Sequence, residues 1–213
     1  MFTTDGASVM LGKRNGVAAK LKENVPHLVQ QHCVAHRENL CISDAWKEVK
    51  ATREIETVVR TVYTLFSRSA TKKSKFKEII EASQNKSIAF KAINEVRWLS
   101  RHFAIKAIIT NYEPLIECFN QDEDDPISKF CLKKLTNIEF QINLEFLSSI
   151  LEELSALCQI FQRRELTSID AFQFARAKIS KMKEKYLGNM AWNNKISERN
   201  IYNRRSAFFL VTA

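Results

Sequence analysis

Apolar residues recur at helical spacing through most of the chain after about residue 35. The longest stripe has intervals of four, three, four, three, four and three positions, and it consists of Phe140, Leu144, Leu147, Leu151, Leu154, Cys158 and Phe161. Residues at these intervals share one face of a helix. We expect this face to pack on the core of its own domain, and a dimerising seam between two chains is the alternative.

Local sequence signals mark where two helices begin. Asp125 followed by Pro126 places a side-chain acceptor at the N-cap and a proline where no amide hydrogen is needed. Thr167 and Asp170 resemble a capping box. The apolar face that follows consists of Ile169, Phe172, Ile179, Met182 and Tyr186, which predicts an antiparallel partner for the preceding helix. By contrast, the polar residues 69–74 predict a loop.

The strand signals lie near the N-terminus. Residues 1–5 are typical of the end of a strand, and residues 28–33 predict a second short strand. Between them, residues 17–21 predict a short helix that ends before Pro26. Two strands do not make a stable sheet alone. The predicted fold class is therefore mainly α with a small β component.

Composition narrows the class of protein. The chain is 45% hydrophobic, which indicates a globular protein, and it contains no run of about 18 apolar residues, so we expect no membrane span. Five scattered cysteines are typical of reduced thiols rather than of a disulfide framework. We therefore expect a cytosolic or nuclear protein.

The positive charge is concentrated in one segment. Residues 47–106 carry 14 basic and six acidic side chains, which gives +8 of the total formal charge of +9. A localised basic segment is typical of polyanion binding, and a solvated helix face is the alternative.

Three short motifs could carry chemistry. Asp5 follows a strand and precedes a glycine, as metal-binding carboxylates often do, although a turn residue has the same pattern. Cys33 and His36 form a Cys-x-x-His pair, but no second pair completes a zinc site. Arg97 beside Trp98 could grip a phosphate and stack on a base, or the tryptophan could anchor a helix.

In this order, the motifs resemble the hAT superfamily of DNA transposases and the host proteins derived from them, closest to the zinc-finger-associated group. The resemblance implies an RNase H-like fold in which three acidic residues bind two divalent metals. Asp5 matches the second carboxylate, and Cys33 and His36 match the next strand–helix junction. Arg97 and Trp98 match a pair at the start of a helical insertion, where the tryptophan stacks near a flipped base.

The chain departs from the family pattern in three places. The family's first Asp lies on a strand before the residues given, its final Glu has no convincing counterpart in residues 187–213, and its zinc-finger domain is absent. Because two metals need all three carboxylates, the resemblance implies a fragment without catalysis. Mg²⁺ or Mn²⁺ is the ancestral cofactor, and we expect neither to bind this chain alone.

The sequence thus predicts a truncated RNase H-like α/β core at residues 1–95, an α-helical insertion domain at 96–190 and a basic, apolar tail at 191–213. We expect a nuclear, transposon-derived protein with residual DNA binding of low specificity through Arg97, Trp98, Lys72, Lys73 and Lys75. The alternative is a domesticated helical module that contacts nuclear proteins, in a regulatory or SUMO-ligase-like setting, or a second copy of itself, without nucleic acid.

Overall fold

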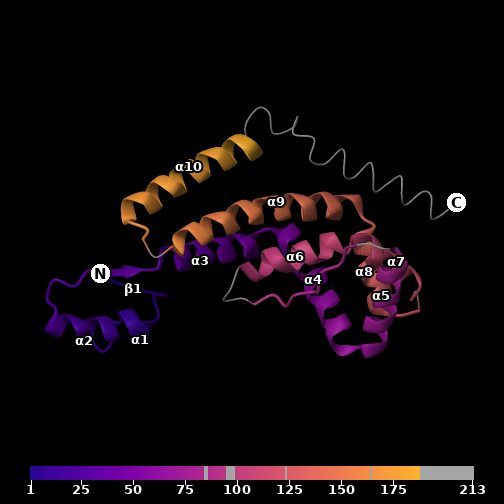
Figure 1. The fold of residues 1–213 in the computed structure, drawn as a ribbon, viewed down its shortest axis with the longest axis horizontal. Coiled ribbons are helices and arrows are strands. Elements are labelled where there is room, and N and C mark those ends of the chain that lie inside the picture. The colour runs from indigo at the N-terminus through magenta and orange to yellow at the C-terminus, as the bar shows by residue number, and fades with distance from the viewer. Residues whose placement is uncertain (84–85, 95–98, 123, 164, 188–213) are drawn as a thin grey trace.

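The computed structural model describes residues 1–83, 86–94, 99–122, 124–163 and 165–187. Two strands, β1 (Phe2–Thr4) and β2 (Gln30–His32), lie in a small N-terminal lobe, and helices with their connecting segments make up the rest of the described residues (Figure 1). The helices are α1 (Ser8–Leu11), α2 (Val17–Asn24), α3 (Val34–Glu48), α4 (Lys50–Arg68), α5 (Ala70–Ser83), α6 (Leu99–Thr110), α7 (Tyr112–Asn120), α8 (Pro126–Leu135), α9 (Ile138–Phe161) and α10 (Ser168–Leu187). The mainly helical class with a small β component is confirmed.

The N-terminal lobe is a parallel β–α–β unit. β1 pairs with β2 in the register Phe2 with Gln30 and Thr4 with His32, and α1 and α2 connect the two strands. The Cys33 amide continues the ladder by donating to the carbonyl of Thr4 at 2.7 Å. Both predicted strands are therefore confirmed, and α3 begins directly where the second one ends.

Gly6 forms the turn at the end of β1. Its φ of +83° lies in the left-handed region, and a Cβ at this position would stand 2.5 Å from Cε1 of His32. A glycine is thus required both by the backbone conformation and by the close approach of the β2 side chain.

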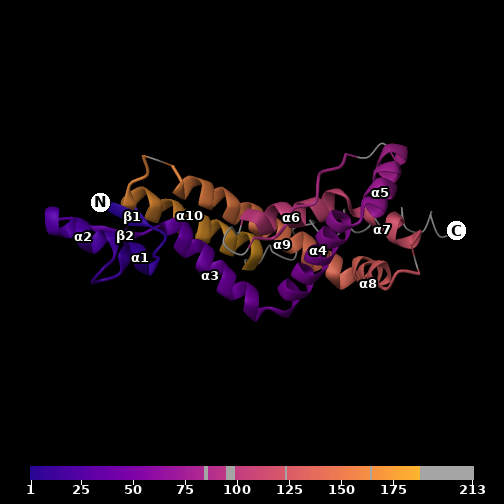
Figure 2. The same cartoon turned by 90° about the horizontal axis from the view of Figure 1, so that it is seen from below.

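The helical body is built around α4 and α9. On α4, the buried apolar residues recur at helical spacing, and they are Ile55, Val58, Val59, Val62 and Phe66. This face packs on α5, α6, α8 and α9. The view from below places the strand lobe at one end of the molecule and α5, α7 and α8 at the other (Figure 2). One hydrophobic cluster runs from Trp46 to Cys158. It therefore contains residues from both sides of position 95, the predicted boundary between the core and the insertion domain.

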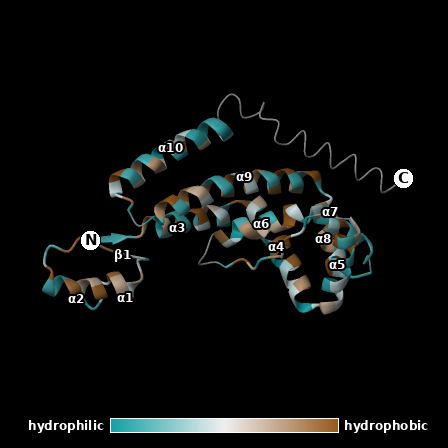
Figure 3. Ribbon diagram, viewed as in Figure 1, coloured by the Kyte–Doolittle hydropathy of each residue, from teal (hydrophilic) through white to brown (hydrophobic). Residues whose placement is uncertain are grey.

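The long stripe on α9 faces this shared core. Phe140, Leu144, Leu151 and Cys158 are buried, and Leu147 and Leu154 pack against the cluster. Figure 3 shows many hydrophobic residues along α9, which lies beside α3 and α6. The expectation that this face packs on its own domain is confirmed, because residues of the same chain already cover most of it.

The prediction of a loop at residues 69–74 is wrong, because α5 begins at Ala70. The Oγ of Ser69 accepts a hydrogen bond from the Lys72 amide at 3.2 Å, which is the geometry of a helix cap. Lysine and alanine favour helices, and the buried Phe76 and Ile79 anchor the new helix to the core. The polar residues at 69–74 therefore form the cap and the exposed first turn of α5, not a loop.

Both predicted helix starts are confirmed. The Asp125 side chain accepts from the Ser128 amide, with Pro126 at the first helical position. Before α10, the Thr167 amide donates to Oδ2 of Asp170 at 3.2 Å, and the Asp170 amide donates to Oγ1 of Thr167 at 3.1 Å. These reciprocal bonds are those of a capping box.

The antiparallel pairing of α9 with α10 is confirmed, but the predicted contact face of α10 is largely wrong. Ile169, Phe172 and Ile179 are 70%, 62% and 51% exposed. The helix instead turns Lys178 and Lys185 toward α9, where both bind Glu153. Two ion pairs lie in this contact together with the ring of Tyr186, which packs on Phe146 of α9, while Ile169, Phe172 and Ile179 stay outside. None of the helices described here is long and apolar enough to cross a bilayer.

Candidate functional site

A pocket of about 360 Å³ lies between α3, α4 and α6. Its lining is mostly polar and consists of Ser43, Trp46, Lys47, Arg53, Glu56, Thr57, Arg60 and Arg101. Four of these side chains are cationic and one is anionic, so the formal charge of the lining is +3. This size is at the low end of small-ligand pockets. The charge favours an anionic occupant.

Helix α4 supplies half of the lining through its amphipathic pattern. Arg53, Glu56, Thr57 and Arg60 recur at intervals of three, one and three residues, so they share the helix face opposite the apolar core. The Oγ of Thr57 donates to the Arg53 carbonyl at 2.9 Å and does not compete for the charged groups. The sequence of one helix thus places two arginines on one side of the pocket.

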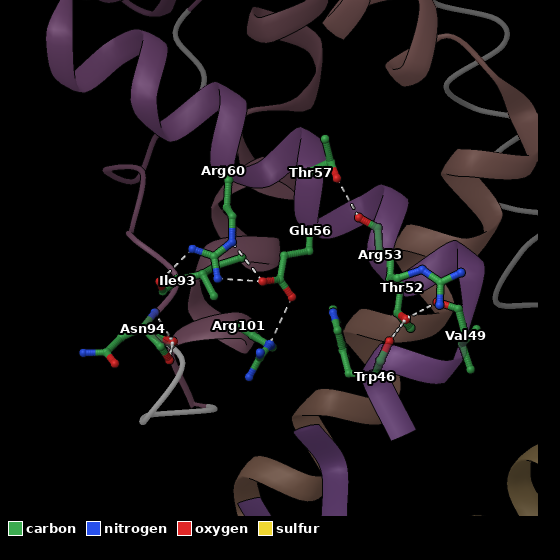
Figure 4. A network of polar contacts seen from close by, with 11 residues as sticks. Trp46, Val49, Thr52, Arg53, Glu56, Thr57, Arg60, Ile93, Asn94 and Arg101 are labelled. Carbon is green, nitrogen blue, oxygen red and sulfur yellow. Dashed lines mark hydrogen bonds and ion pairs between the residues drawn. The ribbon is translucent and has the colours of Figure 1, made fainter. Parts of the chain in front are cut away.

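Glu56 joins two arginines from different helices. Its Oε1 accepts from Nε and Nη2 of Arg60 at 2.8 and 2.6 Å, and its Oε2 accepts from Nε of Arg101 at 3.3 Å. Figure 4 shows the carboxylate between the two guanidinium groups. Arg60 also donates to the Ile93 carbonyl at 3.4 Å. Both oxygens of Glu56 are engaged, which fixes the arginines relative to each other.

Arg101 and Trp46 form the buried wall of the site. They are 4% and 5% exposed, and the guanidinium carbon lies 5.5 Å from the centre of the indole ring. This is a cation–π contact. Within the described part of the chain, Nη1 of Arg101 and Nε1 of Trp46 have no hydrogen-bond partner. A buried donor without an acceptor costs about 1–3 kcal/mol, so these two N–H groups are a notable feature of the pocket.

The connection between α3 and α4 holds Trp46 and Lys47 in place. The Oγ of Thr52 donates to the Trp46 carbonyl at 2.5 Å and to the Val49 carbonyl at 2.6 Å. Arg53 donates through Nη1 to the Lys47 carbonyl. Because these bonds tie the end of α3 to the first turn of α4, the exposed Arg53 and Lys47 lie together at the rim of the pocket.

The motifs at the N-terminus lie apart from this pocket. Asp5 is exposed, and its Oδ1 accepts from the Ala7 amide at 3.1 Å, which is a turn geometry. Cys33 precedes α3, and the His32 and His36 rings lie 5.2 Å apart. In the described residues, no group of three His, Cys, Asp or Glu side chains could hold a metal ion.

The other predicted DNA-binding residues have different surroundings. Arg97 and Trp98 lie outside the described residues. Lys73 is exposed on α5, and Lys75 donates to the Gln121 carbonyl at 3.0 Å. A role for these residues in DNA binding stays a prediction.

Lys72 takes part in an ion-pair cluster between α5 and α8. Its Nζ lies 2.7 Å from Asp122 and 2.5 Å from Asp125. Burial lowers the pKa of Lys72, but hydrogen bonds with the two aspartates outweigh this effect and raise it above its ordinary value. The same lysine lowers the pKa of both carboxyl groups. Lys72 therefore stabilises the start of α8, and its charge is already matched within the chain.

Sequence reasoning had placed the pocket's cations in the basic segment but had not grouped them, and it had missed Trp46. The local signal was the polar face of α4, which repeats at helical spacing. No signal in the sequence connects Trp46 with Arg101, because 55 positions separate them (101 − 46).

Comparison with known proteins identifies the helical part of the chain. No solved structure matches the chain. The family model described as the FAM200/GTF2IRD2 helical domain matches residues 32–184, which include all three helices of the pocket and leave out β1, α1 and α2. That family is transposase-derived, which confirms the expected transposon origin. The chain therefore belongs to the FAM200/GTF2IRD2-like family of transposase-derived helical domains.

Proposed function

We propose that the chain is a DNA-binding helical domain of hAT-type transposase origin that acts in the nucleus and does not cut DNA. The observation that carries this proposal is the pocket of α3, α4 and α6, where four cationic side chains meet one carboxylate. Phosphate contacts from lysine and arginine supply most of the affinity of non-specific DNA binding. Arginine also binds phosphate oxygens through charge-assisted hydrogen bonds, which suits the exposed Arg53 at the rim of the pocket.

The separation of charge along the chain supports the same function. Residues 47–106 hold nearly the whole surplus of positive charge. Some of these cations are matched within the chain, as Lys72 is by Asp122 and Asp125. Arg53 contacts a carbonyl oxygen, so its positive charge is not cancelled by that contact. The rim of the pocket is thus the part of the basic segment best suited to meet a phosphate backbone.

The proposed origin explains the N-terminal lobe. We propose that the parallel β1–β2 pair, with its helical crossover, is the retained part of an RNase H-like core. Asp5 stands at the end of β1, where the family's second carboxylate is expected. Among the described residues, no group of three His, Cys, Asp or Glu side chains that could hold a metal ion includes Asp5, and we therefore assign this lobe no strand cleavage with Mg²⁺ or Mn²⁺.

Fluorescence anisotropy with a labelled duplex of about 20 base pairs tests the DNA binding. We expect affinity to fall by at least about tenfold between about 50 and 200 mM salt, with a linear dependence on the logarithm of salt concentration. Changing Lys47 and Arg53 together to Gln reduces the steepness of the plot of log affinity against log salt concentration by about two, one for each lost phosphate contact. The matched control changes the exposed Lys13 and Arg14 of the N-terminal lobe to Gln. Binding that is absent at low salt, or that does not respond to salt, contradicts the proposal.

A second candidate is a protein-interaction module without a nucleic-acid role. The exposed apolar stripe of α10, with Ile169, Phe172 and Ile179, favours it. Exposed apolar patches mark contact surfaces in many proteins. Light scattering with and without DNA separates the two candidates, since an interaction module self-associates or stays monomeric regardless of DNA, whereas a DNA-binding domain gains mass only with it.

A further inference from the structure

The pocket of α3, α4 and α6 has donors that the protein itself does not use. Among the described residues, Nη1 of Arg101 and Nε1 of Trp46 have no acceptor, although both side chains are more than nine-tenths buried. Both residues line the pocket. Because burial without an acceptor is unfavourable for both, an oxyanion that enters the pocket and reaches these N–H groups would supply the missing acceptor.

Glu56 determines which part of Arg101 remains available. The carboxylate takes the Nε proton at 3.3 Å, and it binds Arg60 through its other oxygen. The indole ring lies 5.5 Å from the guanidinium carbon. With one edge bound by Glu56 and the ring of Trp46 beside it, the Nη1 end is the part of Arg101 that is left for a ligand.

The charge and depth of the pocket select the kind of phosphate. The lining carries four positive charges against one negative charge. A backbone phosphodiester carries one negative charge, whereas a phosphomonoester carries close to two and has three acceptor oxygens. A phosphate within a duplex is flanked by its neighbours along the strand. A terminal phosphate projects and can enter a pocket whose donors are buried.

We propose that this pocket binds a phosphomonoester, with Arg101 and Trp46 as buried donors and with Arg53 and Lys47 at the rim. The shared chemistry is the dianionic phosphate group, which is supplied either by the 5′ end of a nucleic acid or by a small phosphorylated molecule. The nucleic-acid source rests on the proposed DNA binding, whereas the small-molecule source does not.

The test compares oligonucleotides of one sequence that carry either a 5′ phosphate or a 5′ hydroxyl. We expect the phosphorylated form to bind about tenfold more tightly, as for one charge-assisted contact. Trp46→Phe removes the indole N–H and keeps an aromatic ring, and Arg53→Gln removes an exposed rim charge. In each variant, the ratio of the affinity for the 5′-phosphorylated oligonucleotide to that for the 5′-hydroxyl oligonucleotide falls close to one. Arg68→Gln, which changes another exposed arginine of α4, leaves the ratio unaltered.

Thymidine 5′-monophosphate and thymidine form the second arm, read by thermal unfolding of the unmodified chain without DNA. Stabilisation by the monophosphate alone, absent in Trp46→Phe, supports the site with a small molecule as its source even if oligonucleotide ends are not distinguished. If neither arm responds to the phosphate, the inference is overturned. In that case, equal binding of both oligonucleotides still upholds DNA binding, and no binding of either one overturns that function as well.

Discussion

Arg101 on α6 donates its Nε proton to Oε2 of Glu56 on α4 at 3.3 Å, and this pair joins two helices through residues that lie 45 positions apart in the sequence. The Arg101 side chain is 5% exposed and that of Glu56 is 17% exposed. A guanidinium group at this depth depends on its carboxylate, because a buried charge without a counter-charge is costly.

Glu56→Gln is therefore expected to lower the free energy of unfolding by about 3 kcal/mol, since it leaves the charge of Arg101 without a counter-charge. Urea unfolding followed by circular dichroism measures the change. Glu78→Gln, on an exposed position of α5, is the matched control and is expected to stay within about 0.5 kcal/mol. An unchanged midpoint in Glu56→Gln would show that the pair contributes nothing.

Glu38 on α3 makes stability depend on pH. Burial raises its pKa from the ordinary value of 4.5 to about 7, and its two oxygens have no hydrogen-bond partner among the described residues. The folded state favours the protonated form of Glu38. The stability that this side chain contributes is therefore fully present below the unfolded pKa near 4.5, and it is lost as pH rises through about 7.

The neutral variant Glu38→Gln is accordingly expected to exceed the unmodified chain in stability by about 2 kcal/mol at about pH 8, and to match it at about pH 4. Thermal or urea unfolding across this range measures both curves. Glu48→Gln changes an exposed carboxylate of the same helix. It should leave unaltered the difference in the free energy of unfolding between the two pH values. A constant offset at all pH values would contradict the burial argument.

Gly6→Ala tests the turn that ends β1. The new Cβ meets the His32 ring at 2.5 Å in a backbone conformation that alanine rarely adopts. We expect a loss of about 1–2 kcal/mol, expressed as faster hydrogen exchange of β1 and β2. Asn15→Ala, at an exposed turn of the same lobe, is the control. Unaltered exchange in the strands would show that His32 moves aside without cost.

Glu153 holds α10 on α9 by binding both Lys178 and Lys185. The hydrogen bond from Lys178 is the largest of the effects that lower its carboxyl pKa. Glu153→Gln should loosen α10, so we expect proteolysis in the connection after α9 to accelerate about fivefold or more, as for a local loss of about 1 kcal/mol. Glu184→Gln, exposed on α10 itself, is the control. Equal cleavage rates would show that apolar contacts, rather than these ion pairs, hold the helix.

Part of the candidate site could be predicted from the sequence. The basic segment at 47–106 contained Lys47, Arg53, Arg60 and Arg101, and the transposon origin followed from the motifs near the N-terminus. The grouping of these cations was not visible, since α4 and α6 approach each other only after the core forms. Asp5 could be matched to one carboxylate of the family's metal centre, but a complete centre depends on residues from several elements, which one strand end does not supply.

The sequence by itself determined where most of the helices and strands form, the start of α5 excepted, because caps, glycine turns and apolar spacing act over a few neighbouring residues. It thereby specified the start of α8, the capping box of α10 and the core-facing stripe of α9. Only the tertiary structure decided which face of α10 is covered and which charges converge on Trp46. Those outcomes depend on Glu153 and Glu56, carboxylates whose partners lie far away along the chain, and pairing across a folded core cannot be predicted from local spacing.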